Sequence, residues 1–293
     1  MTKDMRIVIA VLALSGILAS CVDNQTNSTS EVKTSKMTNK EIVGTFLGAV
    51  MKQDTVTMQQ VTNADYIQHN PFLPTGLAPF IGLLPVLKEH GTYAENVRMF
   101  QDGDYVFMHN IWHNAKPFGA DKMVAFDIIR VDENGKVAEH WDAMMPQTPP
   151  NASGRTLTDG TTEITDLDET EENKVKATVL FNTLINGSQE EVGKIVMETF
   201  TPNYKQHNPD AEDGIEAVFK AFGEQQWRML KQHKVLGEGN FVLSITEGTV
   251  KNKPAVFYDL LRFDKGKVIE HWDVIQAIPT EGLANNNTMF NFK

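Results

Sequence analysis

Three blocks of this sequence occur twice in the same order, and no other feature constrains the fold as strongly. The pairs are residues 66–71 and 204–209, residues 126–132 and 258–264, and residues 135–142 and 266–273. Their offsets are 138, 132 and 131 residues. Solenoid repeats have much shorter periods, of about 20–50 residues. The 293 residues are therefore expected to form two copies of one domain.

In each copy, segments with helical periodicity precede segments with strand alternation. Helices are expected near residues 42–51, 55–61 and 190–200, with a further helix after Gly76 and after Gly214. Strands are expected at residues 105–112, 123–131 and 136–145, and the sequence Asp-Glu-Asn-Gly at 132–135 predicts a hairpin between the last two. Helices followed by an antiparallel sheet indicate the α+β class.

These patterns predict a first domain at residues 39–147 and a second at 173–293. The linker between them, residues 148–172, is rich in Pro, Thr, Asp and Gly and has little apolar content. The chain after residue 280 is rich in Asn. Its apolar residues are Met289, Phe290 and Phe292, and the sequence does not decide whether they pack on a domain.

The first 20 residues have the pattern of a bacterial lipoprotein signal peptide. Lys3 and Arg6 precede an apolar run of 12 residues, which is too short to span a membrane. The tetrapeptide Leu-Ala-Ser-Cys that ends at Cys21 resembles a lipobox, whose cysteine is acylated after cleavage. Residues 21–38 are mostly polar and are expected to form a flexible tether. The alternative is a short signal anchor, or a buried helix with an incidental cysteine.

A lipidated Cys21 would anchor the protein on the extracytoplasmic side of a bacterial cell envelope. Several acyl chains hold a protein stably, because each buried CH₂ group contributes about 0.8 kcal/mol. Val22, rather than Asp, follows the cysteine. By analogy with sorted lipoproteins, this favours the outer membrane.

Charge and composition exclude several classes of protein. The formal net charge is -11 and no run of Lys and Arg occurs, so a nucleic-acid partner is not expected. One cysteine can form neither an internal disulfide nor a cysteine-rich zinc site. Motifs for phosphate loops, serine triads and dinucleotide binding are also missing from the sequence.

The repeated motifs Tyr-x-x-His-Asn-Pro, Asp-x-x-Arg and Gly-Lys-x-x-Glu-His-Trp-Asp resemble the SnoaL-like polyketide cyclase family. This family belongs to the nuclear transport factor 2-like superfamily, and the resemblance covers residues 39–147 and 173–280. It implies a curved antiparallel sheet wrapped by about three helices around a conical apolar pocket. Family enzymes of the cyclase type perform an intramolecular aldol condensation with acid/base residues and without a metal or other cofactor. Relatives include isomerases and dehydratases.

Two functions remain open, because this superfamily mixes enzymes with binding modules. The first is cofactor-free acid/base chemistry of the aldol, cyclase or isomerase type on a small apolar or carbonyl-containing ligand. The second is a non-catalytic ligand-binding or protein-interaction module. Under either function, the two domains are expected to form an intramolecular pseudo-dimer.

The candidate chemical groups follow from strand alternation. Alternation places His140 and Asp142 on one face of the last strand, and Glu139 and Trp141 on the other. Acid/base chemistry beside a carbonyl needs a base and a donor, and burial in an apolar cavity raises the pKa of an aspartate. Asp142 matches the Trp-Asp position of the family and is the preferred base. In the second copy that position is Asp273.

Two further residues of each copy complete the candidate site. Asp127 lies on the neighbouring strand of the hairpin, and His69, before Asn-Pro, is expected at the mouth of the pocket. His140 or His69 is the expected proton donor. The candidate catalytic residues are therefore His69, Asp127, His140 and Asp142, with His207, Asp259, His271 and Asp273 in the second copy.

Purely structural roles are the alternative. Glu139 can pair with Arg130, His140 can bond a backbone carbonyl, and Asp127 can cap or pair. His109 and His113 share a strand face and could ligate a metal with a third histidine. The second copy has Ile and Thr near those positions, so exposed strand histidines and no metal are expected.

Overall fold

The computed structural model describes residues 37–292. The expected signal peptide (1–20), Cys21 and all but the last two residues of the expected tether lie outside these described residues. Within residues 37–292, no helix combines the length and the apolar character needed to cross a membrane.

The first half of the chain folds as helices and one five-stranded sheet. Its helices are α1 (Asn39–Lys52), α2 (Thr55–Val61), α3 (Leu77–Ile81) and α4 (Leu84–His90). Its strands are β1 (Thr62–Gln68), β2 (Tyr93–Asp102), β3 (Tyr105–His113), β4 (Lys122–Val131) and β5 (Val137–Pro146), and a short 3₁₀ helix, η1, covers Lys116–Phe118. The strand order is β1-β5-β4-β3-β2.

The second half repeats this arrangement. Its helices are α5 (Thr170–Asn186), α6 (Gln189–Thr199) and α7 (Ile215–Gln225), preceded by the 3₁₀ helix η2 (Leu167–Glu169). Its strands are β6 (Phe200–Gln206), β7 (Trp227–Glu238), β8 (Phe241–Val250), β9 (Lys253–Asp264) and β10 (Lys267–Ala277). The strand order, β6-β10-β9-β8-β7, matches that of the first sheet.

Two tandem α+β domains are therefore confirmed, with one addition to the expected sheets. The first strand of each sheet runs parallel to the last, so both sheets are mixed and not wholly antiparallel. β1 was not predicted from the sequence, because its residues Thr62–Gln68 are mostly polar and do not alternate. The edge strand β2 was also missed.

Local sequence sets where the helices begin and break. Thr38 and Glu41 form a capping box at the start of α1, and Ser188 and Glu191 form one at α6. After Gly76 the first half has two short helices, α3 and α4, because Pro85 lies in the first turn of the second of these and stops a continuous helix. The second half lacks this proline and forms one helix, α7.

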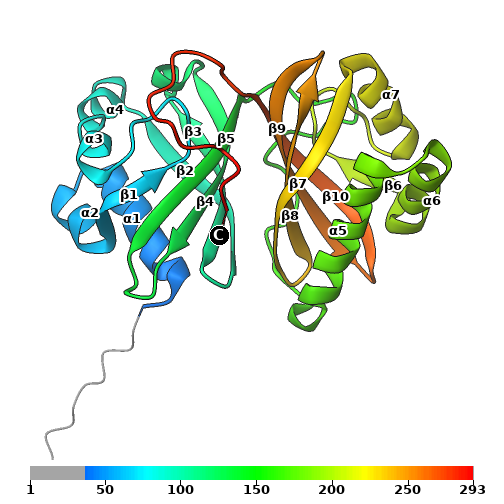
Figure 1. The fold of residues 1–293 in the computed structure, drawn as a ribbon, viewed down its shortest axis with the longest axis horizontal. Helices are drawn as coiled ribbons and strands as arrows, with labels where there is room; N and C mark the ends of the chain where they lie inside the picture. Colours follow the sequence, from blue (N-terminus) through cyan, green and yellow to red (C-terminus); the bar gives the residue numbers. More distant parts are fainter. Residues whose placement is uncertain (1–36, 293) are drawn as a thin grey trace, which may run out of the picture. The chain divides into compact units, whose positions relative to one another are not determined.

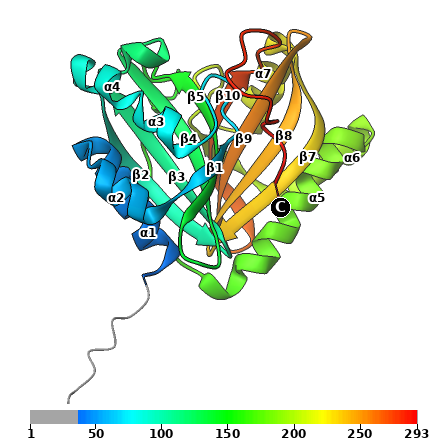
Figure 2. The ribbon, with the colours of Figure 1, turned by 60° about the vertical axis from the view of Figure 1, so that its left-hand side comes forward.

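Each sheet has one face covered by its own helices (Figures 1 and 2). In the first half, α1 to α4 pack over Val106, Met108 and Ile129. In the second, α5 to α7 pack over Val242, Leu261 and Phe263. The opposite faces of both sheets contribute to a single hydrophobic cluster. Its aromatic side chains include Phe107, Phe126 and Trp141 from the first sheet and Phe241, Tyr258 and Trp272 from the second.

The segments that follow the two sheets are closely packed. Leu157 of the expected linker and Met289 of the C-terminal segment are both buried in the shared cluster. Gly160 has a φ of 92°, and a Cβ atom there would lie 2.6 Å from the Trp272 ring. Phe292 stacks on Trp141 with ring centroids 4.7 Å apart. The C-terminal segment therefore does pack on a domain, and the linker is an ordered part of the structure.

Candidate functional site

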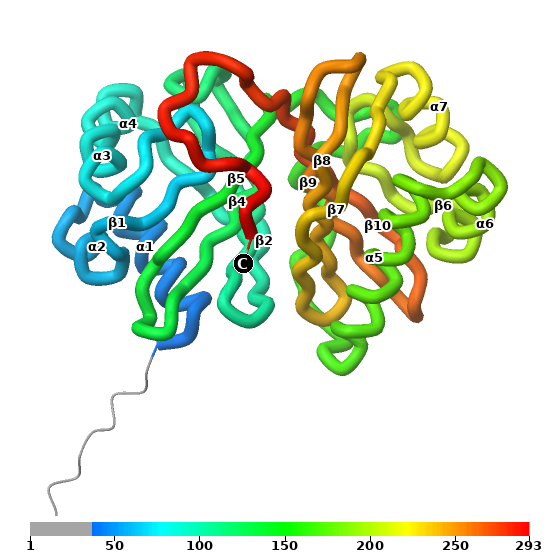
Figure 3. The backbone as a smooth tube through the Cα atoms, viewed as in Figure 1, coloured from blue at the N-terminus to red at the C-terminus, as the bar shows by residue number. Residues whose placement is uncertain are grey.

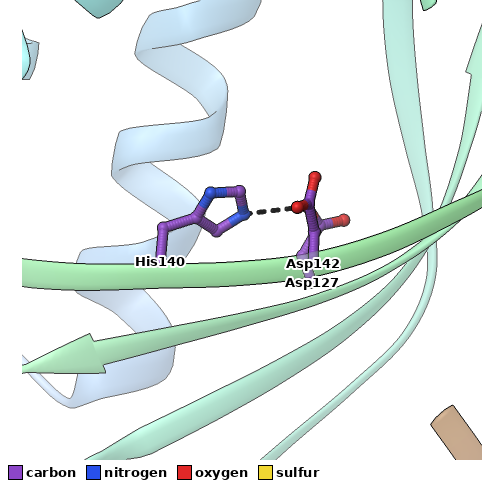
Figure 4. Close-up of side chains that lie close together, drawn as sticks. All are labelled: Asp127, His140 and Asp142. Atoms are coloured by element: carbon purple, nitrogen blue, oxygen red, sulfur yellow. Dashed lines mark hydrogen bonds and ion pairs between the residues drawn. The ribbon is translucent and has the colours of Figure 1, made fainter. Parts of the chain in front are cut away.

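Three of the candidate residues of the first half meet on the helix-covered face of the sheet (Figure 4). Asp127 of β4 is the register partner of Asp142 of β5, and His140 points to the same side. His140 Nε2 lies 3.0 Å from Asp127 Oδ1. Glu139 and Trp141 point to the opposite side of β5, so the alternation expected along this strand is observed.

The second half contains the same cluster. Asp259 of β9 pairs in register with Asp273 of β10. His271 Nε2 lies 3.1 Å from Asp259 Oδ1. Both aspartates are buried, with 3% of each residue exposed. We call Asp127, His140 and Asp142 the first triad, and Asp259, His271 and Asp273 the second triad.

A glutamine at the end of β1 and an asparagine in the turn that follows hold the first triad. Asn70 N donates to Gln68 Oε1 at 2.9 Å, which fixes this oxygen as the atom that faces His140. His140 Nδ1 lies 3.1 Å from the same oxygen and therefore donates to it. Asn70 Nδ2 donates to Asp142 Oδ2 at 2.9 Å. Gln206 and Asn208 make the corresponding contacts to His271 and Asp273.

These glutamines and asparagines were not among the predicted site residues. The signal for them was present, because the full repeated motif is Tyr-x-Gln-His-Asn-Pro. The Asn-Pro pair was interpreted only as a turn, and a turn residue that also turns its side chain toward a strand cannot be recognised from spacing alone.

The first triad favours a positively charged imidazole beside a carboxyl group that gains and loses a proton readily. Burial by itself would lower the pKa of His140, but the hydrogen bond to Asp127 and the charge of Asp142 bring it above its ordinary value. Burial raises the pKa of Asp142 to about 6 despite the opposing effect of His140. In the second triad, burial likewise raises the pKa of Asp273 to about 6.

A cavity of about 430 Å³ lies between the helices and the sheet of the second half. Its walls are mostly apolar side chains of α5, α6, α7 and β7, including Phe181, Val196 and Phe222. Asp259 and His271 are polar residues of this lining. The volume is enough for roughly a dozen non-hydrogen atoms, since a water molecule takes about 30 Å³. An apolar cavity with a few polar groups is the usual form of a small-molecule site.

The two triads differ in which carboxylate oxygen is free. Among the described residues, Asp142 Oδ1 is buried without a hydrogen-bond partner in the first triad, and Asp259 Oδ2 in the second. In the first half, Asn110 Nδ2 donates a hydrogen bond to Asp127 Oδ2 at 2.7 Å, so this oxygen is not free. The second half has Thr246 at the position of Asn110, which leaves the corresponding oxygen of Asp259 free.

The choice of base is therefore different in the second half from the one made on the sequence. Both oxygens of Asp273 lie 2.8 Å from Asn208 Nδ2, and Asp273 is not among the residues that line the cavity. Asp259 lines it and has the free oxygen. In the first half, the free oxygen belongs to Asp142, the residue preferred from the sequence.

His69 and His207 do not join the triads, so their expected place at the pocket mouth is wrong. His69 stacks on Trp141, with ring centroids 4.3 Å apart, and its Nε2 lies 3.2 Å from Glu139. His207 makes the same contacts to Trp272 and Glu270. Successive side chains of this extended segment alternate, so the Asn side chain points to the triad and the His side chain to the opposite face.

The remaining sequence alternatives are now placed. Arg130 Nε donates to Glu139 Oε1 at 2.9 Å, so the expected pairing across the hairpin is present. His109 is fully buried and not exposed as expected, because it faces the shared cluster and lies 3.0 Å from Arg98 Nη1. His113 lies 3.4 Å from Glu95. Neither histidine belongs to a triad.

Within residues 37–292, each triad is also the set of side chains with the spacing for a metal ion, because its ligand atoms lie within 4.8 Å of one another. In the structure, two of the three side chains of each triad bond each other, and the third accepts from an asparagine. His140 Nε2 and Asp127 Oδ1 form an ion pair, and a cation at this place would have to replace that contact.

Comparison with known proteins gives similarities to solved structures only, since neither protein-family models nor curated protein sequences match this chain. IdmH of Streptomyces antibioticus, described as a candidate polyketide cyclase, is 17% identical with a TM-score of 0.31; the match covers 37% of this chain and 92% of IdmH. A candidate ketosteroid isomerase of Kribbella flavida is 18% identical with a TM-score of 0.32, over 39% and 86% of the two chains.

A nuclear transport factor 2-like protein of unknown function from Cytophaga hutchinsonii is 13% identical with a TM-score of 0.33, over 39% of this chain and 95% of its own. Each of these three solved chains is matched over most of its own length and covers well under half of this one.

Proposed function

We propose that the chain is an enzyme that transfers protons on small, largely apolar carbonyl compounds, in reactions of the aldol, cyclase or isomerase type. One observation carries this proposal: a buried carboxylate oxygen without a partner lies beside a histidine in an apolar cavity. A carboxylate oxygen that accepts no hydrogen bond from the protein is available to accept a proton from a ligand. A neighbouring positive charge stabilises an enolate as it forms.

In the second half, the residue that would touch the ligand is Asp259. Its free Oδ2 accepts the proton from the carbon beside the carbonyl group, so that the C–H bond breaks and an O–H bond forms. The electron pair moves to the carbonyl oxygen, where the charge of His271 stabilises it. Asp259 then returns the proton to another carbon, or to the product of carbon–carbon bond formation. In the first half, Asp142 would take the role of base.

The alternative is a binder without turnover. The apolar walls of the cavity in the second half fit a binder as well as an enzyme, because leucine, phenylalanine and valine side chains hold a ligand without acting on it. The triad separates the two functions, since a binder has no need for a free buried carboxylate oxygen.

Exchange of α-protons for deuterium tests the proposal without knowledge of the substrate. A panel of apolar cyclic and linear ketones is incubated with the full chain in D₂O, and the α-proton signals are followed by NMR. We expect at least one ketone to exchange faster than in buffer. The double variant Asp142→Asn, Asp259→Asn should slow this exchange about 100-fold or more, as is usual for loss of a general base.

Asp121→Asn is the matched control, because Asp121 is an exposed carboxylate on a loop and should leave the rate unchanged. A chelator should also have no effect. Ketones that bind, as seen by saturation transfer, but do not exchange would establish the binder. A double variant with the wild-type rate would overturn the assignment of the bases.

We also propose that the protein is a lipoprotein anchored through Cys21 in the bacterial cell envelope. The proposal rests on the apolar run, the lipobox-like tetrapeptide and the polar tether. Mass spectrometry of the chain expressed in a bacterium should find acyl groups on Cys21 and no residue before it. Cys21→Ala should release the protein from the membrane fraction. An unmodified Cys21 in a membrane-bound chain would contradict the proposal.

A further inference from the structure

The two halves exchange the segments that follow their sheets. Residues 284–292 come after the second sheet and pack on the turn that follows β1 of the first half (Figure 3). Residues 151–161 come after the first sheet and pack on the corresponding turn of the second half. We call residues 284–292 the tail and residues 151–161 the connector.

Side chains of the tail bond the backbone of the turn that follows β1 in the first half. Asn285 Nδ2 donates to the carbonyl oxygens of Asn70 and Leu73, both at 2.7 Å. Asn287 Nδ2 donates to the carbonyl oxygen of Gln68 at 2.9 Å. The tail therefore bonds the backbone of both Gln68 and Asn70, whose side chains contact His140 and Asp142 of the first triad.

The connector does the same for the second half. Asn151 Nδ2 lies within hydrogen-bond distance of three carbonyl oxygens of the turn, at 2.7 Å from Gln206, 3.2 Å from Asn208 and 2.9 Å from Ala211. Asn151 is buried, with 8% of the residue exposed. One side chain of the connector thus contacts the backbone of both Gln206 and Asn208, which hold the second triad.

The correspondence extends to the two histidines that do not join the triads. His69 Nδ1 donates to the carbonyl oxygen of Thr288 in the tail at 2.7 Å. His207 Nδ1 donates to that of Thr156 in the connector, also at 2.7 Å. The repeated histidine therefore serves as an attachment point for the exchanged segment.

Each exchanged segment also contacts the residue seven positions after the glutamine, and this contact is a hydrogen bond in the first half and an ion pair in the second. Asn287 of the tail lies 3.4 Å from Thr75, whose hydroxyl accepts from Gln68 N. In the second half, Arg155 of the connector forms a 2.6 Å ion pair with Asp213, whose carboxylate accepts from Gln206 N. Both pairs tie an exchanged segment to the residue that fixes the start of the turn.

We propose that Asn285 and Asn151 are positioning residues: Asn285, which comes after the second sheet, holds the first triad, and Asn151, which comes after the first sheet, holds the second triad. Asn285 acts through the turn that carries Gln68 and Asn70, and Asn151 acts through the turn that carries Gln206 and Asn208. This inference deepens the proposed function and rests on it for its catalytic meaning, but its geometry can be measured without a substrate.

The test uses the full chain and the isosteric variants Asn285→Asp and Asn151→Asp, which keep the size of the side chain and remove its N–H donors. Carboxyl and imidazole titrations are followed by NMR. Asn70 lowers the pKa of Asp142 through its hydrogen bond, so a loosened turn should raise that pKa. In Asn285→Asp we expect the Asp142 midpoint to rise by about half a pH unit and the Asp273 midpoint to stay.

Asn151→Asp should give the reverse pattern, with a raised midpoint for Asp273 and an unchanged one for Asp142. The controls are Asn286→Asp and Ala152→Asp, which add the same charge at exposed neighbours in the same segments. If either Asn variant leaves both midpoints at their wild-type values, or moves both equally, the proposal is overturned. Ketone exchange measured in parallel separates this outcome from failure of the proposed function, since the titrations do not depend on turnover.

Discussion

Trp272→Ala is expected to lower the free energy of unfolding by about 3–5 kcal/mol, the usual cost of truncating a buried aromatic side chain. Trp272 is fully buried in the cluster to which both sheets contribute. One ring face stacks on His207, and the Arg98 guanidinium lies 4.3 Å from the ring centroid. Its Nε1 donates to the carbonyl oxygen of Asp159 in the connector at 2.8 Å. The truncation therefore removes apolar burial, two ring contacts and a hydrogen bond together.

Urea unfolding followed by circular dichroism measures this effect. Trp227→Ala is the control, because Trp227 is only half-buried beside the cavity and should cost clearly less. Since one cluster contains side chains of both sheets, the wild-type chain should unfold in a single transition. A loss below about 1 kcal/mol for Trp272→Ala would contradict the role given to this cluster.

Glu270→Ala is expected to have an effect of similar size, about 3–5 kcal/mol, because it leaves buried partners without their counter-charge. Glu270 is 1% exposed. Arg262 Nε donates to one of its oxygens at 2.8 Å, and His207 Nε2 lies 3.0 Å from the other. Removing the carboxylate leaves a largely buried guanidinium uncompensated and also loosens the histidine that attaches the connector.

The difference between wild type and variant should depend on pH. Burial alone would raise the pKa of Glu270, but hydrogen bonds from His207 and Arg262 bring it below its ordinary value of 4.5. A lowered carboxyl pKa stabilises the fold above the ordinary value, and this contribution is lost as the pH falls below it. Unfolding at pH 7 and at pH 4 should therefore show a smaller difference at pH 4. Glu224→Ala, which breaks the exposed contact with Lys220, is the control and should have little effect at either pH.

Strand alternation made the triads predictable from the sequence. Alternation places the His and Asp of the repeated His-Trp-Asp on one face of the last strand and the Trp on the other, but it does not tell which face the helices cover. Asp127 followed from the hairpin turn, because the turn sets the register that brings it opposite Asp142. These inferences need only local periodicity, which a single sequence contains.

The exchanged segments could not be predicted in this way. The connector has few apolar residues, and its contacts are made by polar side chains to backbone carbonyl oxygens of a distant turn. Backbone acceptors have no sequence signature, so Asn151 and Asn285 look like ordinary loop residues. His69 was misplaced because the Asn-Pro pair was interpreted only as a turn, whereas the extended segment before the proline turns the His and Asn side chains to opposite faces.

The two turns that hold the triads cannot gain their exchanged segments in the order in which a ribosome makes the two halves. The first half is synthesised first, yet its turn after β1 lacks the contacts with Asn285 and Thr288 until residues 285–288 have emerged. The second half finds its connector already made. Nascent chains generally fold from the N-terminal domain onward, whereas here the turn after β6 can make its contacts with the connector before the turn after β1 can make its contacts with the tail.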